Sequence, residues 1–514
     1  MKKTYSIFLF LITFISFSVT ADYHHTFEKN TGGWVSYNYW GGKTELSSEA
    51  AYGGKKSMKL TATEYRGKIY GLCILPVVDS NLCGKKVSVS FYAKGKGSIK
   101  AGILYYTRNS RGGENMIYDY CEPVTLNDQW QKVEFIADFA DIAVEKIAPA
   151  IRIDGEGYAF IDEAKVVIIK PGNISVAALD KHQIVRSGSA LSKLRFRVST
   201  PGADVTFFTF SENRKQQVIK NSASSDGQGQ TAYTDQTVLP AGEVSVIAAA
   251  GGANSIHYSY VMPETEYDDL DAIAKTISLN KPLHILYIGD SLADRDRGHN
   301  FTDKLVWWLN KYNPGKVSLQ NLAVSGDFIT RVESRMKVRL KQSRESVWKQ
   351  YVYNDLFNRP YDLIIISLGH NDCASFKKSN YRQPQVSLSA AEAAYKNVIA
   401  MLRSKSKAPV ILLSPVASNL KVSKEQGALS VRYGGAGAVF GMPEFIVPFN
   451  KMLAEVAAGS NCYYVDMYTP TKENAALASW YIRDGVHLTP AGHQMFASLV
   501  LKALASENSP LKNK

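Results

Sequence analysis

The spacing of the apolar residues changes once along this chain, near residue 280. Before that point, short segments alternate apolar and polar residues between Gly, Asn and Asp turns, as in KVSVSFYAKGKG and QWQKVEFIADF. After it, near-continuous apolar runs such as HILYIGD and YDLIIISLG alternate with amphipathic stretches. The first pattern is typical of antiparallel strands, and the second indicates a parallel sheet covered by helices on both faces. The chain therefore predicts β-sandwiches followed by an α/β domain.

Five segments are expected along the chain. Its 514 residues, 45% of them apolar, are too many for one hydrophobic core. We predict a signal peptide over residues 1–21, a β-sandwich over 22–170, a second β-sandwich-like domain over 171–263, a three-layer α/β domain over 264–507 and a flexible tail over 508–514.

The N-terminus has the features of a cleavable signal peptide. Lys2 and Lys3 precede the apolar run SIFLFLITFISFSV, and small residues follow up to Ala21. No cysteine follows this run, so no lipid anchor is expected, and no second apolar stretch reaches the roughly 20 residues of a membrane helix. We expect a secreted or periplasmic protein without a transmembrane segment.

The cysteines limit which disulfides the chain can form. The five cysteines are odd in number and specify no disulfide framework. Cys73, Cys83 and Cys121 either form one bridge or are simply buried. Cys373 and Cys462 are expected at opposite edges of the sheet and therefore not in a disulfide with each other.

The formal net charge of +13 favours acidic partners such as uronate polymers, cell-wall polymers or anionic membranes. No nucleic-acid partner is expected.

Polar groups follow the apolar strands of the second half. GDS ends at Ser291, SGD contains Gly326, GHND contains Asn371, and DGVH runs from Asp484 to His487. Ligands of parallel α/β sheets bind at the carboxyl ends of the strands, so these groups are expected at one edge of the sheet.

These residue types fit acyl transfer by a serine. A hydroxyl such as that of Ser291 needs a base, and histidine is the side-chain type whose ordinary pKa suits that role near neutral pH, which makes His487 the candidate base. Asp484, three residues earlier, can orient the imidazole. The backbone amides of Ser291 and Gly326, with the Asn371 side chain, supply donors for an oxyanion hole. No clustered zinc-ligand spacing lies near the serine, so neither a metal nor a cofactor is expected there.

The four blocks, in this order, resemble those of the SGNH (GDSL-type) hydrolases. The resemblance spans roughly residues 283–505 and implies a flavodoxin-like domain, with Ser291 as nucleophile, Gly326 and Asn371 in the oxyanion hole, and Asp484 and His487 completing the triad. The chain departs from short family members by long inserts, including the basic RVESRMKVRLKQSRESVWKQ and KEQGALSVRYGGAGAVFG.

The neighbouring polar residues have simpler explanations. Asp290 and Asp372 are expected to make turn hydrogen bonds. His299, His370 and His493 lack a partner of the kind that Asp484 provides for His487, and we interpret them as structural or rim residues.

The first β-sandwich resembles carbohydrate-binding modules of the jelly-roll type, on the stretches FEKNTGGWVSYNYWGG, AAYGGKKSMKLTA and YAFIDEAKVVI. The resemblance implies a structural calcium ion near Glu28 and Asp162. Aromatic rings are candidates for stacking on sugar faces, and the glycan-binding candidates are Trp34, Tyr37, Tyr39 and Trp40.

Together these features predict a secreted serine esterase that hydrolyses O-acyl esters, O-acetyl esters first among them, on a polysaccharide that the basic charge suggests is acidic. Three alternatives remain: a lipase or thioesterase, an O-acetyltransferase, and a non-catalytic glycan-binding protein.

Overall fold

The computed structural model describes residues 22–36, 41–65, 67–75, 82–108, 114–140, 142–144, 146–169, 173–179, 182–211, 214–221, 228–235, 239, 241–432 and 435–511. The chain divides into two compact units. Unit 1 comprises residues 1–180, 191–236 and 244–257, and unit 2 comprises residues 181–190, 237–243 and 258–514. The predicted signal peptide lies outside the described residues, and the domain boundaries at 170 and 263 stay predictions.

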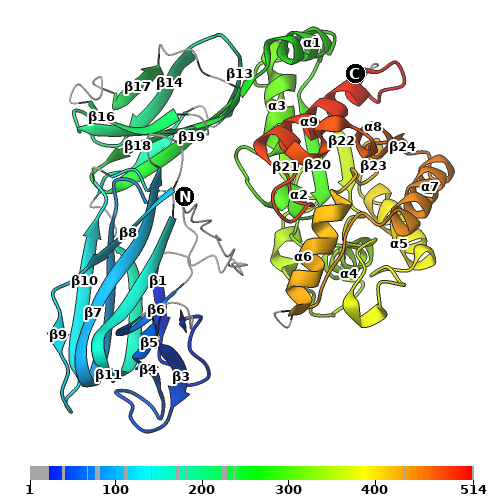
Figure 1. Cartoon of the computed structure of the whole chain (residues 1–514). Coiled ribbons are helices and arrows are strands. Elements are labelled where there is room, and N and C mark those ends of the chain that lie inside the picture. Colours follow the sequence, from blue (N-terminus) through cyan, green and yellow to red (C-terminus); the bar gives the residue numbers. More distant parts are fainter. Residues whose placement is uncertain are drawn as a thin grey trace, which may run out of the picture. The chain divides into compact units, whose positions relative to one another are not determined.

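An 11-stranded antiparallel sheet dominates the described part of unit 1 (Figure 1). Its strands are β1 (Asp22–His25), β2 (Val35–Ser36), β3 (Lys43–Ser47), β4 (Ser57–Thr61), β5 (Thr63–Tyr65), β6 (Lys68–Ile74), β7 (Lys86–Arg108), β8 (Glu114–Tyr120), β9 (Val124–Thr125), β10 (Gln131–Asp138) and β11 (Lys146–Ile169). The long strands β7 and β11 pair along most of their length, and register shifts interrupt the pairing after Asp154 and Asp162. The apolar positions of β7 and β10 alternate with polar ones, so one face of these strands builds the core.

Two smaller sheets follow. A three-stranded sheet has the order β12 (Val176–Ala178), β14 (Leu191–Val198), β17 (Gln230–Asp235). A five-stranded sheet has the order β13 (His182–Arg186), β19 (Ala253–Met262), β18 (Gly242–Ala250), β15 (Val205–Ser211), β16 (Arg214–Asn221). Within unit 2, β13 pairs in parallel with the end of β19. Ile184 and Tyr260 from these strands belong to the same core cluster as Leu270 and Trp308, so the start of the α/β domain is packed on strands that precede its predicted boundary.

A parallel five-stranded sheet forms the centre of the α/β domain. Its order is β21 (Val317–Asn321), β20 (Leu283–Gly289), β22 (Leu363–Ser367), β23 (Val410–Leu413), β24 (Tyr463–Val465). Along β20, Ile285 and Tyr287 enter one core cluster whereas Leu286 and Ile288 enter another. This strand is therefore buried on both faces, as its continuous apolar run predicts, and the predicted parallel sheet is confirmed.

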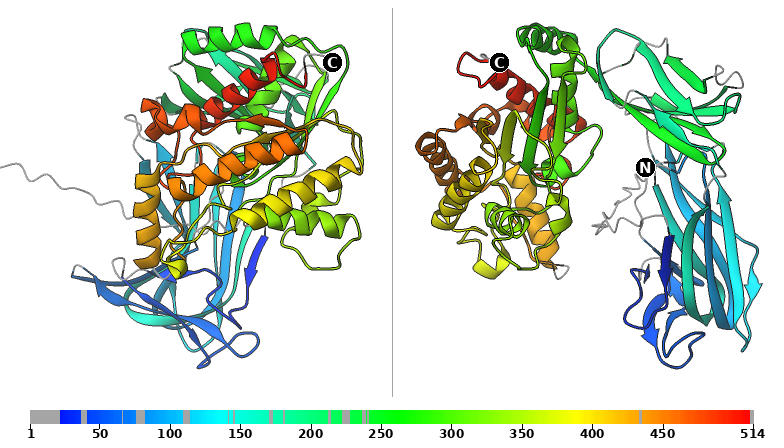
Figure 2. Two further views of the ribbon diagram at one scale, coloured as in Figure 1. Left: turned by 90° about the vertical axis from the view of Figure 1, so that its right-hand side faces the viewer. Right: turned by 180° about the vertical axis from the view of Figure 1, so that it is seen from behind.

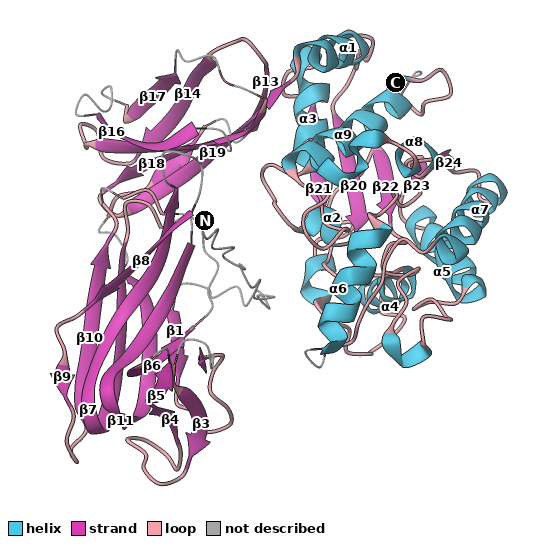
Figure 3. Ribbon diagram, viewed as in Figure 1, coloured by secondary structure: helices cyan, strands magenta, loops and turns pink. Residues whose placement is uncertain are grey.

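Helices cover both faces of this sheet (Figures 2 and 3). Residues of α1, α3 and α9 join the core on one face, and residues of α4, α5 and α7 join the core on the other. The helices are α1 (Glu264–Lys275), α2 (Ser291–Asp294), α3 (Phe301–Tyr312), α4 (Ile329–Arg339), α5 (Leu388–Arg403), α6 (Leu420–Arg432), α7 (Pro443–Gly459), α8 (Thr469–Lys472) and α9 (Pro490–Ala505), with 3-10 turns η2 (Gln350–Tyr353), η3 (Lys377–Ser379) and η4 (Ala475–Ser479).

All five cysteines lie in the described part of the chain, and none of them is in a disulfide. Cys73 and Cys83 are buried, which supports burial over a bridge for this group. Within the described ranges, no helix has the length and apolar character needed to span a membrane.

Candidate active site

The candidate nucleophile, Ser291, is the first residue of α2, directly after β20. The Asp290 carboxylate caps this short helix by accepting the Leu292 N–H at 3.0 Å. Gly289 is needed at the strand end, because a Cβ there would lie 2.5 Å from the Tyr287 ring. Since the first N–H groups of a helix have no acceptor within the helix, the Ser291 amide is available to a ligand.

A loop beyond the last strand brings a histidine to this serine. His487 Nε2 lies 2.8 Å from Ser291 Oγ, and His487 Nδ1 lies 2.6 Å from Asp484 Oδ2. The other Asp484 oxygen accepts the backbone N–H groups of Val486 and His487, each at 2.9 Å. The structure thus brings together the three residues predicted to act as a triad.

The electrostatics of the loop keep the acid ionised. Burial acts to raise the pKa of Asp484, but the hydrogen bond from His487 and the two backbone N–H groups outweigh it and hold this pKa below its ordinary value. An ionised Asp484 places the imidazole proton on Nδ1 and leaves Nε2 as the acceptor that faces the serine hydroxyl.

The two other candidate oxyanion donors lie in loops that follow β21 and β22, the strands on either side of β20. Gly326 has a left-handed φ of 79°, which side chains other than glycine rarely adopt. The Ser325 N–H and hydroxyl donate to Asp294 Oδ2 at 2.8 and 2.7 Å, so this loop is tied to the end of α2. The Asn371 amide donates one N–H to the Asp327 carbonyl at 2.9 Å, which joins the two loops.

A buried ion pair lies next to the oxyanion loops and includes one of their residues, Asp327. Arg335 of α4 and Asp327 are both 0% exposed, and the guanidinium donates to both carboxylate oxygens of Asp327. It also donates to the Trp348 carbonyl, at 3.2 Å from Nε and 2.8 Å from Nη2. Arg335 lies within the basic insert, and no functional role was predicted for it. Its spacing from Val332 and Met336, which puts it on the buried face of α4, is the signal that could have found it.

In unit 1, one predicted glycan contact is wrong. Trp34 is 1% exposed and belongs to the core of the large sheet, so its ring is closed to a sugar. Its burial follows from packing against residues distant in sequence, which the aromatic-rich stretch alone does not reveal. Tyr37, Tyr39 and Trp40 lie outside the described residues.

A different aromatic group lies on β6, β8 and β11. The Arg152 guanidinium carbon lies 5.4 Å from the Tyr70 ring centroid and 5.9 Å from that of Tyr120. The rings of Tyr118 and Tyr120 are nearly parallel, at 10°, with centroids 6.1 Å apart. Tyr118 is 36% exposed, so this group offers an accessible ring and a cation.

Glu28 and Asp162, the two carboxylates expected near a calcium ion, accept hydrogen bonds from backbone N–H groups. Glu28 Oε1 accepts the N–H groups of Lys55 and Lys56, and Asp162 Oδ2 accepts those of Tyr52 and Gly53. No group of three or more His, Cys, Asp or Glu side chains placed to hold a metal ion is found in the described ranges. These side chains do not by themselves fit a calcium ion, and its presence stays a prediction.

Family comparisons agree with this geometry. Residues 287–495, which include the triad and both oxyanion loops, match the GDSL-like Lipase/Acylhydrolase family. This segment is a GDSL-like acylhydrolase domain. Residues 22–138 match a carbohydrate binding domain. No curated protein matches the chain.

Three solved structures that are similar to parts of this chain are distant from it in sequence. An acetylxylan esterase from Geobacillus stearothermophilus is 19% identical with a TM-score of 0.31, and the match covers 44% of this chain and 94% of that one. A lipase/acylhydrolase from Enterococcus faecalis is 17% identical with a TM-score of 0.31, covering 43% and 95%. A xylan-binding domain from Paenibacillus barcinonensis is 22% identical with a TM-score of 0.24, covering 29% and 95%.

Two buried carboxyls flank the nucleophile and oxyanion loops of the acylhydrolase domain. Asp290 Oδ1 accepts the Leu292 N–H at 3.0 Å, so the predicted turn hydrogen bond is confirmed for this residue. Asp372 Oδ1 accepts instead the N–H of Ile329, which lies 43 positions away in the chain, also at 3.0 Å. Burial raises the pKa of each carboxyl to about 7, with the negative charge of Asp327 adding to the effect. The Oδ2 atoms of both are buried without a hydrogen-bond partner among the described residues.

Two of the three histidines interpreted as structural, His299 and His493, have partners that are distant in sequence. His299 Nδ1 lies 2.8 Å from Glu243 Oε2, and its ring stacks on Tyr258 with centroids 3.8 Å apart. His493 Nε2 lies 3.5 Å from Asp296 Oδ2. Burial, with a smaller effect of the nearby His487, lowers the pKa of His370 to about 3, so His370 is neutral. That His299, His370 and His493 are structural or rim residues stays a prediction.

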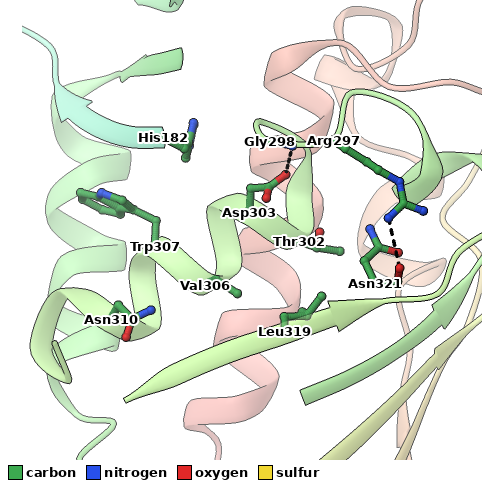
Figure 4. Close-up of a pocket in the computed structure, with 10 residues that line it drawn as sticks. All are labelled: His182, Arg297, Gly298, Thr302, Asp303, Val306, Trp307, Asn310, Leu319 and Asn321. Carbon is green, nitrogen blue, oxygen red and sulfur yellow. Dashed lines mark hydrogen bonds between the residues drawn. The ribbon is translucent and has the colours of Figure 1, made fainter. Parts of the chain in front are cut away.

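A separate cavity of about 390 Å³ lies beside α3 and β21 (Figure 4). In Figure 4, the Asp303 carboxylate is hydrogen-bonded to Gly298 and the Arg297 guanidinium reaches Asn321. No triad residue lines the cavity, and no sequence pattern indicated it. The residues that line it are His182, Arg297, Gly298, Thr302, Asp303, Val306, Trp307, Asn310, Leu319 and Asn321.

Proposed function

We propose that the protein is a secreted serine esterase that removes O-acyl groups, acetyl first among them, from a polysaccharide through an acyl-enzyme on Ser291. The contact of His487 Nε2 with Ser291 Oγ at 2.8 Å, with Asp484 behind it at 2.6 Å, carries this proposal. The match to the acylhydrolase family supports the reaction class, and the match to a carbohydrate binding domain supports a glycan as substrate.

In the acylation step, His487 Nε2 takes the proton of Ser291 Oγ as this oxygen bonds to the ester carbonyl carbon. The carbonyl oxygen becomes an oxyanion, which the Ser291 and Gly326 amides and the Asn371 side chain stabilise. The protonated imidazole then gives its proton to the sugar oxygen as the carbon–oxygen bond breaks, which releases the deacylated glycan.

In the deacylation step, His487 takes a proton from water while the water oxygen attacks the acyl carbon. The new tetrahedral intermediate collapses, Ser291 Oγ recovers a proton from the imidazole, and the carboxylic acid leaves. Asp484 stays ionised throughout and stabilises the imidazolium.

The proposal includes secretion of the protein and an acidic polysaccharide as its substrate. The charged and apolar N-terminal segment up to Ala21 supports export. The net charge of +13 favours an acidic polymer. The accessible ring of Tyr118 and the cation of Arg152 support glycan binding by unit 1.

Release of acetate tests the proposal. The native protein, Ser291→Ala and the control Ser404→Ala are compared on p-nitrophenyl acetate and on a panel of acetylated glycans that includes acetylated xylooligosaccharides. Ser404 is an exposed serine at the C-terminal end of α5. We expect activity in the native and control proteins and its loss in Ser291→Ala. Equal traces from all three would refute the esterase, and transfer of acetyl to a sugar acceptor without acetate release would indicate a transferase.

A further inference from the structure

The insert between α4 and β22 presents the two most exposed large apolar side chains of the described residues. Trp348 is 64% exposed and Tyr351 is 67% exposed, whereas the other exposed large apolar side chains lie between 36% and 51%. Residues 329–350 carry seven Lys and Arg residues against two Glu residues. Two open aromatic rings close together in a basic segment are accessible to a ligand.

This surface adjoins the oxyanion loop. The Lys349 ammonium lies 3.7 Å from Asp294 Oδ2, at the end of the helix that begins with Ser291. The same oxygen accepts the N–H and the hydroxyl of Ser325, the residue before Gly326. The Lys349 ammonium is also 6.0 Å from the Trp348 ring centroid. The ring and the ammonium therefore lie together at the rim of the candidate active site.

The turn that presents them is fixed from within. Lys349 has a left-handed φ of 50°, which is uncommon for a residue other than glycine. The buried Arg335 guanidinium holds the Trp348 carbonyl, and Gln350 Nε2 donates to the Arg335 carbonyl at 3.0 Å. A buried guanidinium is unfavourable unless it is fully paired. Movement of the turn would leave the Arg335 guanidinium without one of its partners, so these hydrogen bonds keep the turn rigid. A rigid turn lowers the entropy lost when a ligand binds.

The cation can leave its present partner without leaving a buried charge unpaired. Asp294 also binds Arg297 Nη2 at 2.9 Å, in addition to Ser325. Burial acts to raise the pKa of Asp294, but the hydrogen bonds from Ser325 and Arg297 outweigh it and the pKa is lowered. Asp294 therefore stays ionised and paired when Lys349 turns to a ligand. Arg331, 29% exposed at its side chain, supplies a second cation beside Gly326.

We propose that Trp348 and Lys349 form a subsite for a uronic acid residue of the acylated glycan. The indole face packs on the sugar ring, and the ammonium pairs with the sugar carboxylate. The subsite rests on the proposed esterase function and deepens it, because it makes the insert the element that selects an acidic polymer.

The test compares kcat/KM on three esters: an acetylated oligouronate, an acetylated neutral oligosaccharide and p-nitrophenyl acetate. For Lys349→Gln we expect the ratio of the oligouronate value to the p-nitrophenyl acetate value to fall about tenfold, as loss of one charge pair with partial desolvation implies. Trp348→Ala should lower this ratio for both oligosaccharides. In the native protein, about 0.5 M salt should reduce the oligouronate value selectively.

Two matched controls accompany the variants. Tyr463→Ala changes an exposed aromatic ring at the start of β24, and Lys451→Gln changes an exposed lysine of α7. Both should leave the ratios unchanged. Equal native kcat/KM on the acidic and neutral oligosaccharides, with ratios unaffected by Trp348→Ala and Lys349→Gln, would overturn the subsite while leaving the esterase in place.

Binding separates this proposal from the catalytic one. Calorimetry of the non-acetylated oligouronate with the full-length Ser291→Ala protein needs no turnover, and the carbohydrate binding domain contributes equally to both proteins compared. Adding Trp348→Ala to Ser291→Ala should remove one binding event. If the native protein hydrolyses none of the esters, this loss would still support the subsite, whereas identical binding by the two proteins would refute it.

Discussion

His487 Nε2 lies 2.8 Å from Ser291 Oγ, although 196 positions of the chain separate the two residues. Ser291 follows β20, and His487 lies in a loop beyond β24. Since parallel strands end at the same edge of a sheet, the fold collects these distant loops at one place. The loop is shaped locally by Gly485, with a left-handed φ of 75°, and by the hydrogen bond from the Ile482 N–H to the His487 carbonyl.

Asp484→Asn tests the tautomer of this histidine. The asparagine oxygen can still accept the N–H groups of Val486 and His487, so the loop should keep its shape. Its NH₂ group would then face His487 Nδ1 and move the imidazole proton to Nε2, where it can no longer accept from Ser291. We expect kcat on p-nitrophenyl acetate to fall by about 10²–10⁴-fold.

The matched control for this change is Asp466→Asn. Asp466 is exposed and also accepts two backbone N–H groups, from Tyr468 and Thr469 at 2.9 and 3.0 Å. It should retain native activity. Native kcat in Asp484→Asn would show that the acid does not control the base.

Asn371→Ala should reduce kcat more than it changes KM. One N–H of the Asn371 amide is engaged by the Asp327 carbonyl, which orients the other N–H for the oxyanion. Because the oxyanion forms only as the reaction proceeds, loss of one donor is expected to lower kcat by about 10²–10³-fold. Steady-state kinetics on p-nitrophenyl acetate measure both constants. Asn397→Ala, on the exposed face of α5, is the control, and a purely KM effect would contradict the oxyanion role.

The candidate triad could be predicted from sequence because each of its groups sits directly after an apolar strand or beside its partner in one loop. The partners of His299 could not, since Glu243 and Tyr258 come from β18 and β19, strands that sequence assigned to another domain. The burial of Trp34 likewise depends on packing between strands that are distant in sequence. Local patterns thus identify chemistry at strand ends, and tertiary packing decides which polar and aromatic side chains are enclosed.

Arg335→Met should destabilise the acylhydrolase domain. It leaves the Asp327 carboxylate buried beside two oxyanion loops without its main partner, and breaking a buried ion pair in this way lowers the free energy of unfolding by about 3–5 kcal/mol. Denaturant titration measures the change. Lys337→Met, which removes the pair between a 43% exposed lysine and Glu333 on the same helix, should change the stability by less than about 1 kcal/mol. Equal effects of the two substitutions would show that the buried pair is not required.

Asp372→Asn should flatten the pH dependence of stability. In the folded chain the Asp372 carboxyl has a pKa of about 7, chiefly because of burial, whereas in the unfolded chain an Asp titrates at about 3.9. Between these two values the folded state binds the proton and the unfolded state does not. The contribution of Asp372 to stability is therefore largest at low pH, falls as pH rises from about 4 to about 7, and is constant above that range.

Asparagine can keep the hydrogen bond from the Ile329 N–H and carries no titrating proton. The free energy of unfolding of Asp372→Asn should thus fall less steeply between about pH 5 and 7 than that of the native protein, by up to about 1.4 kcal/mol per pH unit. Denaturant titrations at a series of pH values measure both slopes, with the exposed Asp466→Asn as the control that should keep the native slope. Because Asp290 titrates in the same range, some slope should remain in Asp372→Asn. Identical slopes in Asp372→Asn and the native protein would mean that Asp372 is ionised in the folded state despite its burial beside the oxyanion loops.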